Sequence, residues 1–374
     1  MGKFSDLPAE IMLDIFTRLP TESVLDCKSV SKSWRNVIHH RSFSHMHSNI
    51  LLSNPKSVAD SGKLRFVCKM VGGSLCYLEY DDEVSSYRFK KLELSPPFNL
   101  YSILGSYNSL VCINGLPSHY TMDESSTASY VAYICNPITR ESITLPELDR
   151  STYYHLVWFM SSVFGYVAST NEYKVVRLYT FWRSEFANIE VYTLGIGKLW
   201  RNAGKIKVSD SMSRRHAVFV DGFLYWNFGN GRMQAFDLDN GVFVELNECW
   251  NGHFWGGVLG GHYSGTRYSK DGKSVDVWLL KKKEDESISY SKEFSLINMD
   301  SYPTPLSLTS NGTVLCYSDT KLHLHDLKSS SSKVLGDFGR RIHPAVPHMN
   351  TLVSLKAFGE ETTETLKPGE AIKT

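Results

Sequence analysis

The 374-residue sequence lacks an excess of charge of either sign. Forty Lys and Arg residues stand against 39 Asp and Glu residues, which leaves a net charge of +1. Proteins that bind nucleic acid or anionic membranes usually carry a basic patch or a basic excess, because phosphate groups attract cations. The composition therefore predicts neither nucleic acid nor a membrane surface among the partners of this chain.

Ordered cysteine spacing and long apolar runs are also missing. The seven cysteines are irregularly spaced without a C-x-x-C pair, which argues against a disulfide framework and a zinc finger and favours free thiols. The opening residues MGKFSDLP contain no apolar signal core. The longest apolar stretch, around residues 156–168, is interrupted by Ser161 and Ser162 and falls short of the ~18 residues of a membrane span. We therefore expect a cytoplasmic or nuclear protein.

Motifs for catalysis or metal binding are absent from the sequence. It contains no G-x-S-x-G, H-E-x-x-H or G-x-G-x-x-G, and Gly272-Lys273-Ser274 lacks the upstream glycine of a phosphate-binding loop. His45 with His47, and His323 with His325, would each share one face of a strand, but no third ligand lies nearby. We therefore predict no catalytic residue, no metal and no cofactor.

The first 47 residues have a helical pattern. Apolar residues recur at helical spacing between Ile11 and Leu19, Pro8 suits a first helical turn, and Pro20 ends the helix. A second helix capped by Thr21 or Ser23 and a third ending near residue 38 should follow. Three short helices cannot bury all of this apolar surface internally, so the module needs a separate partner or docks on the rest of the chain.

From residue 48 to residue 358 the pattern changes to short β-type runs that repeat. Equivalent positions recur every 42 to 57 residues, with about four strands per unit, which is typical of a kelch-like β-propeller of about six blades. A β-sandwich or two smaller β domains are the alternatives, because short strands alone do not exclude them. The equivalent positions are Tyr80, Asn136, Thr193, Asp237, Leu279 and Asp326.

Both ends of this β domain carry further predictions. The ring could be closed by a strand over residues 48–53 lying beside residues 350–356. Residues 359–374 are rich in glutamate and poor in large apolar residues, which predicts a disordered tail. Hairpin turns are expected where residues that tolerate positive φ occur, as at Asn171-Glu172 and Asp221-Gly222.

Aromatic clusters beside the predicted strands are candidates for binding a target protein, since aromatic residues dominate interface hot spots. Packing between blades is the alternative role, and we favour packing for Trp226 and Trp255. The candidate loops are residues 117–129, 181–187 and 248–256. The candidate target-binding residues are Phe181, Trp182, Trp250, His253 and Phe254.

The N-terminal run LPAEIMLDIFTRLPTESVLDCKSVSKSWRNVI closely resembles an F-box, with Leu7-Pro8, Leu19-Pro20 and Val30-Ser31-Lys32-Ser33-Trp34 in the family's order. Ser31 stands where the family commonly has cysteine. The rest resembles the F-box-associated domain of plant F-box/kelch-type proteins, through segments such as YICNPITRESITLP, IEVYTLGIGKLWR and PLSLTSNGTVLCYSD. Gly-Gly pairs occur at 72–73, 256–257 and 260–261 only, so the blades are not strict kelch repeats.

The resemblance implies a substrate receptor of a Skp-cullin-F-box ubiquitin ligase, in which the F-box binds a Skp-type adaptor and, through it, a cullin and a RING protein. A non-catalytic chain would then present an unidentified target protein for ubiquitination. Two other hypotheses stay open: a propeller-fold enzyme, and an adaptor-bound scaffold that does not promote degradation. By resemblance, the adaptor-binding residues are Leu7, Pro8, Ile11, Ile15, Leu19, Pro20, Leu25, Val30 and Trp34.

Overall fold

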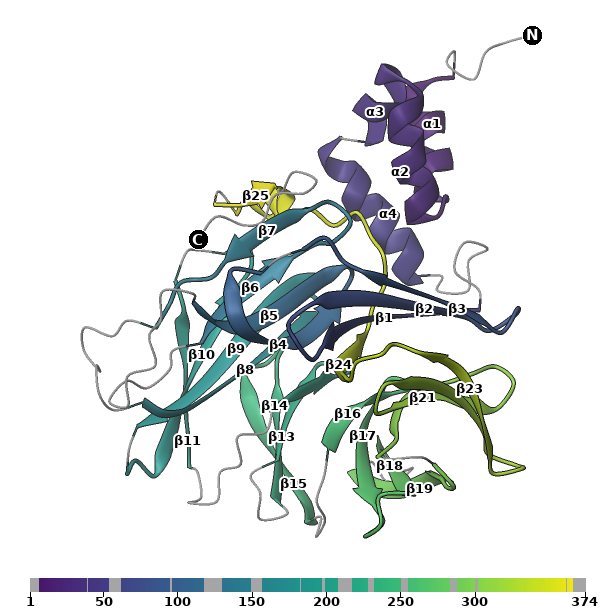
Figure 1. Cartoon of the computed structure of the whole chain (residues 1–374). Coiled ribbons are helices and arrows are strands. Elements are labelled where there is room, and N and C mark those ends of the chain that lie inside the picture. The colour runs from purple at the N-terminus through teal and green to yellow at the C-terminus, as the bar shows by residue number, and fades with distance from the viewer. Residues whose placement is uncertain are drawn as a thin grey trace.

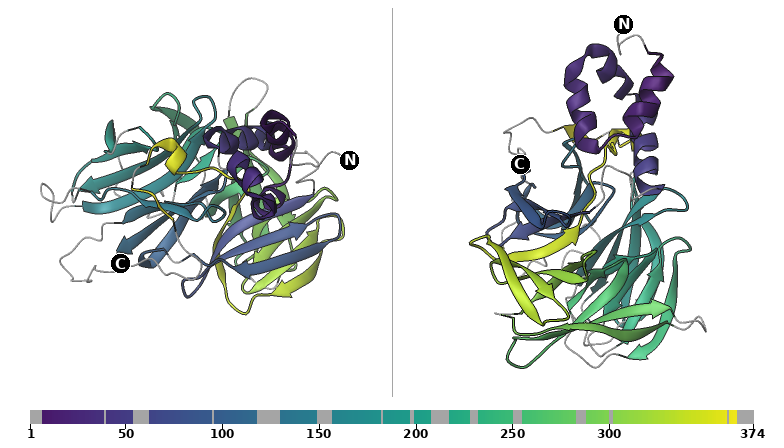
Figure 2. Two further views of the ribbon diagram at one scale, coloured as in Figure 1. Left: turned by 90° about the horizontal axis from the view of Figure 1, so that it is seen from above. Right: turned by 90° about the vertical axis from the view of Figure 1, so that its right-hand side faces the viewer.

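The computed structural model joins an N-terminal helical module to a ring of six β-sheets (Figure 1). Figure 2 shows the helices projecting from one side of the ring. Mainly β architecture with six blades confirms the predicted propeller. The structure describes residues 7–38, 40–53, 62–94, 96–117, 130–148, 157–181, 183–196, 199–207, 217–227, 232–249, 255–282, 288–299, 302–360 and 362–365.

The module contains α1 (Ala9–Thr17), α2 (Thr21–Val30), α3 (Lys32–Ile38) and α4 (Arg41–Ser53). Pro8 and Pro20 occupy the N-cap positions of α1 and α2, where their missing N–H groups cost no helical hydrogen bond. The first three helices were predicted. None of the helices in the described residues is both long and apolar enough to cross a membrane.

Helix α4 corrects the predicted strand over residues 48–53. Phe43, His47 and Leu51 are all buried, and their spacing of four places them on one face of a helix. The helix therefore continues across the expected domain boundary at residue 47. His45 and His47 belong to this helix, so their predicted placement on a strand is also wrong.

The C-terminal end of the domain closes the ring. β24 (Ile342–Pro347) forms the inner strand of the first blade and pairs antiparallel with β1 (Lys63–Met70), which is followed outward by β2 (Leu75–Asp81) and β3 (Ser86–Lys91). The predicted closure by residues 48–53 and 350–356 is wrong, because the former are helical and the latter form no strand. A ring closed by strand pairing exposes no unpaired inner edge at the seam.

The other five blades are each built in chain order. β4 (Phe98–Tyr107), β5 (Leu110–Pro117), β6 (Val131–Cys135) and β7 (Glu141–Thr144) form the second blade, with β25 (Glu364–Thr365) on its outer edge; β8 (Val157–Val167), β9 (Glu172–Phe181), β10 (Phe186–Thr193) and β11 (Arg201–Lys207) form the third; β12 (Val218–Val220), β13 (Phe223–Asn227), β14 (Arg232–Asp237) and β15 (Val242–Cys249) form the fourth; β16 (Trp255–Leu259), β17 (His262–Tyr268), β18 (Val275–Lys282) and β19 (Ile288–Leu296) form the fifth; β20 (Thr304–Leu308), β21 (Thr313–Ser318), β22 (Lys321–Asp326) and β23 (Ser331–Asp337) form the sixth.

The apolar core lies between the blades. Six clusters of buried side chains each draw on two neighbouring sheets, one cluster for every junction of the ring. Trp226 is 2% exposed and packs with Phe236 and Phe243, which confirms its predicted packing role. Burial between blades thus explains why the strands contain so many aromatic residues.

All six equivalent sequence positions lie in, or directly after, the third strand of their blade. Four blades share a turn there, in which an Asp or Asn side chain accepts hydrogen bonds from the backbone N–H groups two and three residues later. At Asn136 these N···O distances are 2.8 and 3.3 Å, and at Asp326 they are 2.7 and 3.0 Å. The same turn occurs at Asp81 and Asp237. In these four blades the Asx turn marks the same point of the repeat seen in the sequence.

The expected tail is partly ordered. Glu360 is buried and accepts hydrogen bonds from the Tyr192 hydroxyl and from the backbone N–H of Gly195, at 2.8 Å for the latter. Residues 364–365 pair with β7. The prediction of disorder from residue 359 onward is therefore wrong for residues 359, 360 and 362–365; residues 361 and 366–374 lie outside the described part of the chain.

Substitution of Ile342, on the strand β24 that closes the ring, tests the junction between the sixth and first blades. Ile342 is 3% exposed in the core between the sixth and first blades. We expect Ile342→Ala to lower the free energy of unfolding by about 2–5 kcal/mol in a urea titration. Leu199→Ala, at a 77% exposed residue, is the matched control and should stay within about 0.5 kcal/mol of wild type. Equal effects of the two substitutions would contradict the closure.

Candidate functional site

The helical module has a small core of its own. Met12 and Phe16 of α1, one turn apart, pack with Val24, Ile38 and Phe43. A further ring contact joins Phe16 to Trp34, with 5.0 Å between centroids. Met12 and Phe16 are therefore buried inside the module, whereas the neighbouring apolar stripe of α1, which begins at Ile11, faces outward.

The residues predicted to bind an adaptor lie mainly outside this core. Ile11 is 49% exposed and Val30 is 61% exposed. Pro8 is exposed as well, whereas the other six are half-buried at the edge of the core: Leu7, Ile15, Leu19, Pro20, Leu25 and Trp34. The structure thus places all nine in one module and leaves the side chains of Ile11 and Val30 open to solvent.

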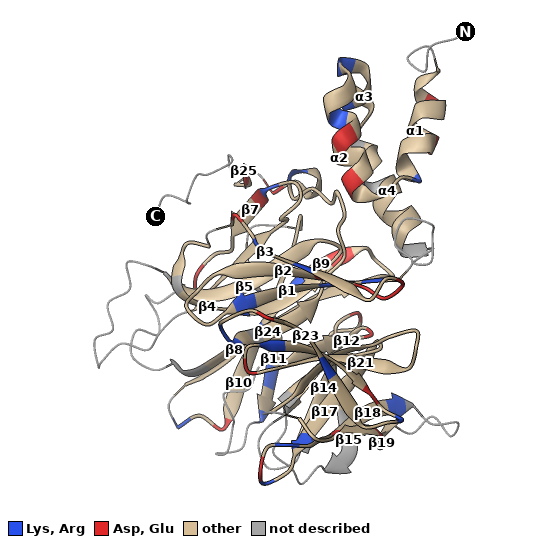
Figure 3. Ribbon diagram, turned by 45° about the vertical axis from the view of Figure 1, so that its right-hand side comes forward, with Lys and Arg blue, Asp and Glu red and all other residues tan. Residues whose placement is uncertain are grey.

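Charges of both signs are spread over the helices and the blades (Figure 3). On α1 an exposed ion pair joins Arg18 to Asp14, with 2.9 Å between Nη2 and Oδ1. An exposed pair of this kind contributes little to stability, because solvent screens it. The charges of the module therefore do not favour a partner of either sign of charge. Its exposed apolar side chains are the more specific feature for recognition.

The module is held to the propeller by buried hydrogen bonds around Asn350. The Thr21 hydroxyl donates to the backbone carbonyl oxygen of Asn350 at 2.7 Å. The Asn350 side-chain amide donates to Glu22 at 2.6 Å and to the Tyr77 hydroxyl at 3.0 Å. Partial burial favours a higher pKa for the Glu22 carboxyl group. Hydrogen bonds from Asn350 and from the backbone N–H of Glu22, together with the nearby positive charges of Arg65 and Lys63, outweigh this effect and lower the pKa overall. Glu22 is therefore an ionised acceptor at neutral pH.

The segment after β24, drawn in yellow in Figure 1, runs between the two domains. Leu352 packs into the core of the helical module, whereas Val353 and Leu355 pack into the core between the second and third blades. Ile138, in the turn between β6 and β7, also contacts the module core. Neighbouring residues of one short segment thus pack into two different hydrophobic cores, that of the helical module and that of the propeller.

Two buried histidines flank this junction. His47 of α4 stacks on Phe43 and contacts the Leu19 carbonyl oxygen at 2.9 Å, and burial lowers its pKa. His348, whose Nδ1 lies 2.7 Å from the Ser106 hydroxyl, has a pKa lowered by burial to about 4. Both imidazoles are therefore neutral near neutral pH, and neither changes charge there.

The other predicted histidine pair has structural contacts. His323 and His325 lie on β22 and are within hydrogen-bond distance of the Ser318 and Ser332 hydroxyls, at 2.8 and 2.7 Å. Among the described residues, His, Cys, Asp and Glu side chains form no group of three that could hold a metal ion. The described cysteines, residues 27, 68, 76, 112, 135 and 316, are free thiols.

Of the predicted target-binding residues, only Phe181 belongs to the described part of the chain. It ends β9, is half-buried, and meets Tyr179 edge to face with 5.7 Å between ring centroids. Phe186, which begins β10 across the same hairpin, is 48% exposed. Sequence reasoning named the loop that contains Phe186 but not the residue itself. Trp182, Trp250, His253 and Phe254 lie outside the described residues.

Strand direction shows at which end of the propeller the three candidate loops begin. The turn at Asn108, which begins β5, and the turn at Asn171, which begins β9, both face α4. The turn before β15 lies beside the second of these, because the Ser169 hydroxyl donates to Asp239 at 3.0 Å. The other ends of these strands, at Pro117 of β5, Phe181 of β9 and Cys249 of β15, therefore lie at the face away from the helices.

Comparison with known families follows the same division of the chain. The F-box-like family model matches residues 4–47, and the model of the F-box associated beta propeller domain matches residues 66–243. The chain belongs to the plant F-box proteins. An F-box followed by a propeller supports, in general terms, a substrate-recognition role in Skp-cullin-F-box ligases. The family also favours a non-catalytic role for the chain.

Similar curated proteins come from Arabidopsis thaliana. The F-box/kelch-repeat protein At3g23880 is 26% identical over 338 residues, which cover 83% of this chain and 85% of the relative. The F-box protein At3g07870 is 26% identical over 339 residues, covering 79% and 73% of the two chains. The F-box protein DOR is 25% identical over 230 residues, which cover 60% of this chain and 55% of DOR.

Similarity to solved structures is weak. A Trypanosoma rangeli sialidase in complex with the inhibitor DANA has a TM-score of 0.43 at 9% identity, covering 73% of this chain and 52% of the sialidase. TolB from Acinetobacter baumannii has a TM-score of 0.30 at 12% identity, covering 76% and 71%. Likeness at this level supports no inference about activity.

Removal of the Asn350 side chain tests the junction. Asn350 is 7% exposed, and its amide satisfies Glu22 and Tyr77 together. We expect Asn350→Ala to lower the free energy of unfolding by about 1–3 kcal/mol in a urea titration at pH 7, because the buried Tyr77 hydroxyl and the Glu22 carboxylate both lose their donor. Asn36→Ala, at an exposed residue of α3, is the control and should change it by less than about 0.5 kcal/mol. A loss at residue 350 no greater than that of the control would contradict the role of this contact.

Proposed function

We propose that this F-box protein is the substrate-recognition subunit of a Skp-cullin-F-box ubiquitin ligase in the cytoplasm or the nucleus. Its helices would bind a Skp-type adaptor, which links it to a cullin and a RING protein, and its propeller would hold a target protein. The observation that carries the proposal is the apolar surface that two helices leave open: Ile11 of α1 and Val30 of α2 remain exposed although the module already has a filled core.

Exposed apolar side chains on short helices suit docking into an apolar groove of a partner. Burial of apolar surface contributes about 25 cal/mol per Å², and helix-in-groove recognition uses residues spaced three or four apart. Ile11 and Ile15 have this spacing on α1, and Leu19 continues it four residues after Ile15, just past the C-cap residue Arg18. A separate partner would cover this stripe, while the other side of the module docks on the propeller through Leu352 and Asn350.

In this proposal the chain catalyses no bond change itself. It holds a target close to a ubiquitin-loaded enzyme, so that attack by a target lysine becomes effectively intramolecular. The ten residues of β9 separate the two ends of the propeller by about 30 Å, from a rise of ~3.3 Å per residue. The candidate target loops at the far end therefore leave the helical end free for the adaptor.

The adaptor contact is tested with substitutions that spare the module core. Ile11→Asp combined with Val30→Asp changes two side chains that are mainly in solvent. We expect at least tenfold weaker binding of a recombinant plant Skp-type adaptor in isothermal titration calorimetry, because two carboxylates would be desolvated in an apolar groove. Half-buried Ile15 and Leu19 are poorer choices, since an aspartate there would also disrupt folding.

Leu199→Asp is the control for this experiment, because it adds the same charge at a 77% exposed residue of the propeller. It should leave the adaptor affinity unchanged, and all variants should share the wild-type Tm within about 2 °C. Undetectable adaptor binding by the wild type, or equal affinities for the double variant and the control, would refute the proposed docking.

The target face is tested at the β9–β10 hairpin. Phe181→Ala combined with Phe186→Ala removes two rings at the far end of the propeller. We expect proximity labelling in plant cells to lose specific partners with this variant, which should still bind the adaptor normally, because anchoring aromatic residues dominate interface energies. Leu199→Ala should keep those partners.

Turnover of the partners separates a ligase receptor from a scaffold. A partner captured through Phe181 and Phe186 should have a longer half-life in cells that express only the Ile11→Asp, Val30→Asp variant. Unchanged half-lives of every such partner would instead favour an adaptor-bound scaffold. A labelling pattern unaffected by loss of the two rings would contradict the assignment of the target face.

A further inference from the structure

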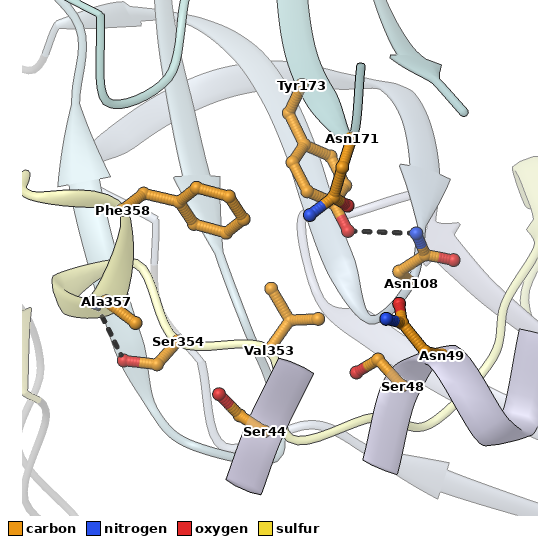
Figure 4. Close-up of a pocket in the computed structure, with 10 residues that line it drawn as sticks. All are labelled: Ser44, Ser48, Asn49, Asn108, Asn171, Tyr173, Val353, Ser354, Ala357 and Phe358. Atoms are coloured by element: carbon orange, nitrogen blue, oxygen red, sulfur yellow. Dashed lines mark hydrogen bonds between the residues drawn. The ribbon is translucent and has the colours of Figure 1, made fainter. Parts of the chain in front are cut away.

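A cavity of about 220 Å³ lies where helix α4 meets the propeller. Four separate parts of the chain line it, namely α4, the turn before β5, the turn before β9 with the start of that strand, and the segment that follows β24 (Figure 4). Its volume corresponds to roughly seven water molecules. A molecule bound there would contact the F-box side and the propeller side simultaneously.

One end of the cavity is aromatic. Tyr173 and Phe358 meet edge to face with 5.4 Å between ring centroids, and Val353 lies beside them (Figure 4). The Tyr173 hydroxyl accepts a hydrogen bond from the Asn108 amide at 2.8 Å, which fixes the position of the ring. This end offers a rigid wall for a flat apolar group.

The other end is polar and contains an unpartnered hydroxyl. Ser44 and Ser48 lie at this end, on α4 (Figure 4). Ser48 is 5% exposed, and its Oγ makes no hydrogen bond within the described structure. Buried hydroxyl groups are nearly always hydrogen-bonded, so this oxygen points to a missing partner.

The charge of the lining restricts the ligand. The ten residues that line the cavity are Ser, Asn, Ala, Val, Tyr and Phe, and none carries a formal charge. An ionised ligand would lose its hydration without gaining a counter-ion, whereas a neutral hydroxyl or carbonyl could pair with Ser48. The lining thus favours an uncharged ligand with a flat apolar body.

We propose that this cavity binds a small uncharged aromatic alcohol or carbonyl compound, which bridges the F-box helices and the propeller. The polar group of the ligand contacts Ser48, and its ring lies against Tyr173 and Phe358. Binding stabilises the docked arrangement of the two domains, because the site exists only when both surfaces are together. The inference is independent of the proposed ligase role, since it concerns the free chain.

The test uses 4-hydroxybenzyl alcohol as the neutral probe and 4-hydroxybenzoate as its anionic counterpart, with the full chain and no adaptor. Saturation-transfer NMR and thermal unfolding should show saturable binding of the alcohol, with a rise in Tm that grows with its concentration. Binding of the anion should be at least tenfold weaker. Absence of saturable alcohol binding, or equal affinity for the two probes, would overturn the proposal.

Variants locate the probe. Ser48→Ala should weaken binding of the alcohol at least tenfold. The Tm of the free protein should stay the same or rise, since the substitution removes an unpartnered buried hydroxyl group. Val353→Phe and, independently, Ala357→Met should fill the cavity and abolish binding; two variants are used in case one does not fold. Leu199→Ala should bind like the wild type. Unchanged affinity in both filled variants would show that the probe binds elsewhere and overturn the assignment.

Discussion

The segment from Ile342 to Glu360 is the constraint on which the rest of the structure depends. Its first part, β24, closes the ring by pairing with β1, and its next residues hold the F-box through Asn350 and Leu352. Val353 and Leu355 then enter the propeller core, and Glu360 binds at Tyr192 and Gly195. One continuous stretch therefore completes the propeller and sets the place of the helices on it.

The same segment fixes the position of the F-box relative to the far end of the propeller. Leu352 and Val353 are adjacent residues in two different hydrophobic cores, so movement of the F-box relative to the propeller would withdraw one of them from apolar surroundings. The two histidines at the junction, His47 and His348, are neutral and add no charge to it. The outward stripe of α1 and the far-face hairpin at Phe181 are thus held at a defined separation by packing rather than by a flexible linker.

Local chemistry made much of the fold predictable. In four blades the end of the third strand is marked by an Asx turn, which one Asp or Asn side chain builds with nearby backbone N–H groups, and this local signal made those strands recognisable in the sequence. Positive φ at Asn171 and Asp221 likewise follows from local preference. The apolar face of the first helix was readable for the same reason, since spacing alone places Ile11, Met12, Ile15, Phe16 and Leu19 on one wide face.

Predictions failed where the deciding contact was remote. Residues 48–53 have an apolar composition that suits a strand, but Phe43, His47 and Leu51 form one buried helical face beneath the F-box. The tail appeared disordered because its partner for Glu360 lies 168 residues earlier, at Tyr192. Which apolar side chains of α1 stay exposed was likewise not readable from periodicity.

By itself, then, the sequence indicated the first three helices of the module, a propeller of about six blades and turns such as those at Asn171 and Asp221, because each depends on residues a few positions apart or on a repeated local pattern. Tertiary structure alone decided how the ring closes, where the F-box sits and which face the aromatic hairpin occupies. These depend on pairs such as Thr21 with Asn350, separated by 329 positions in the chain. Contacts over such distances leave no periodic signal, because burial and hydrogen bonding are satisfied only once the six blades have closed.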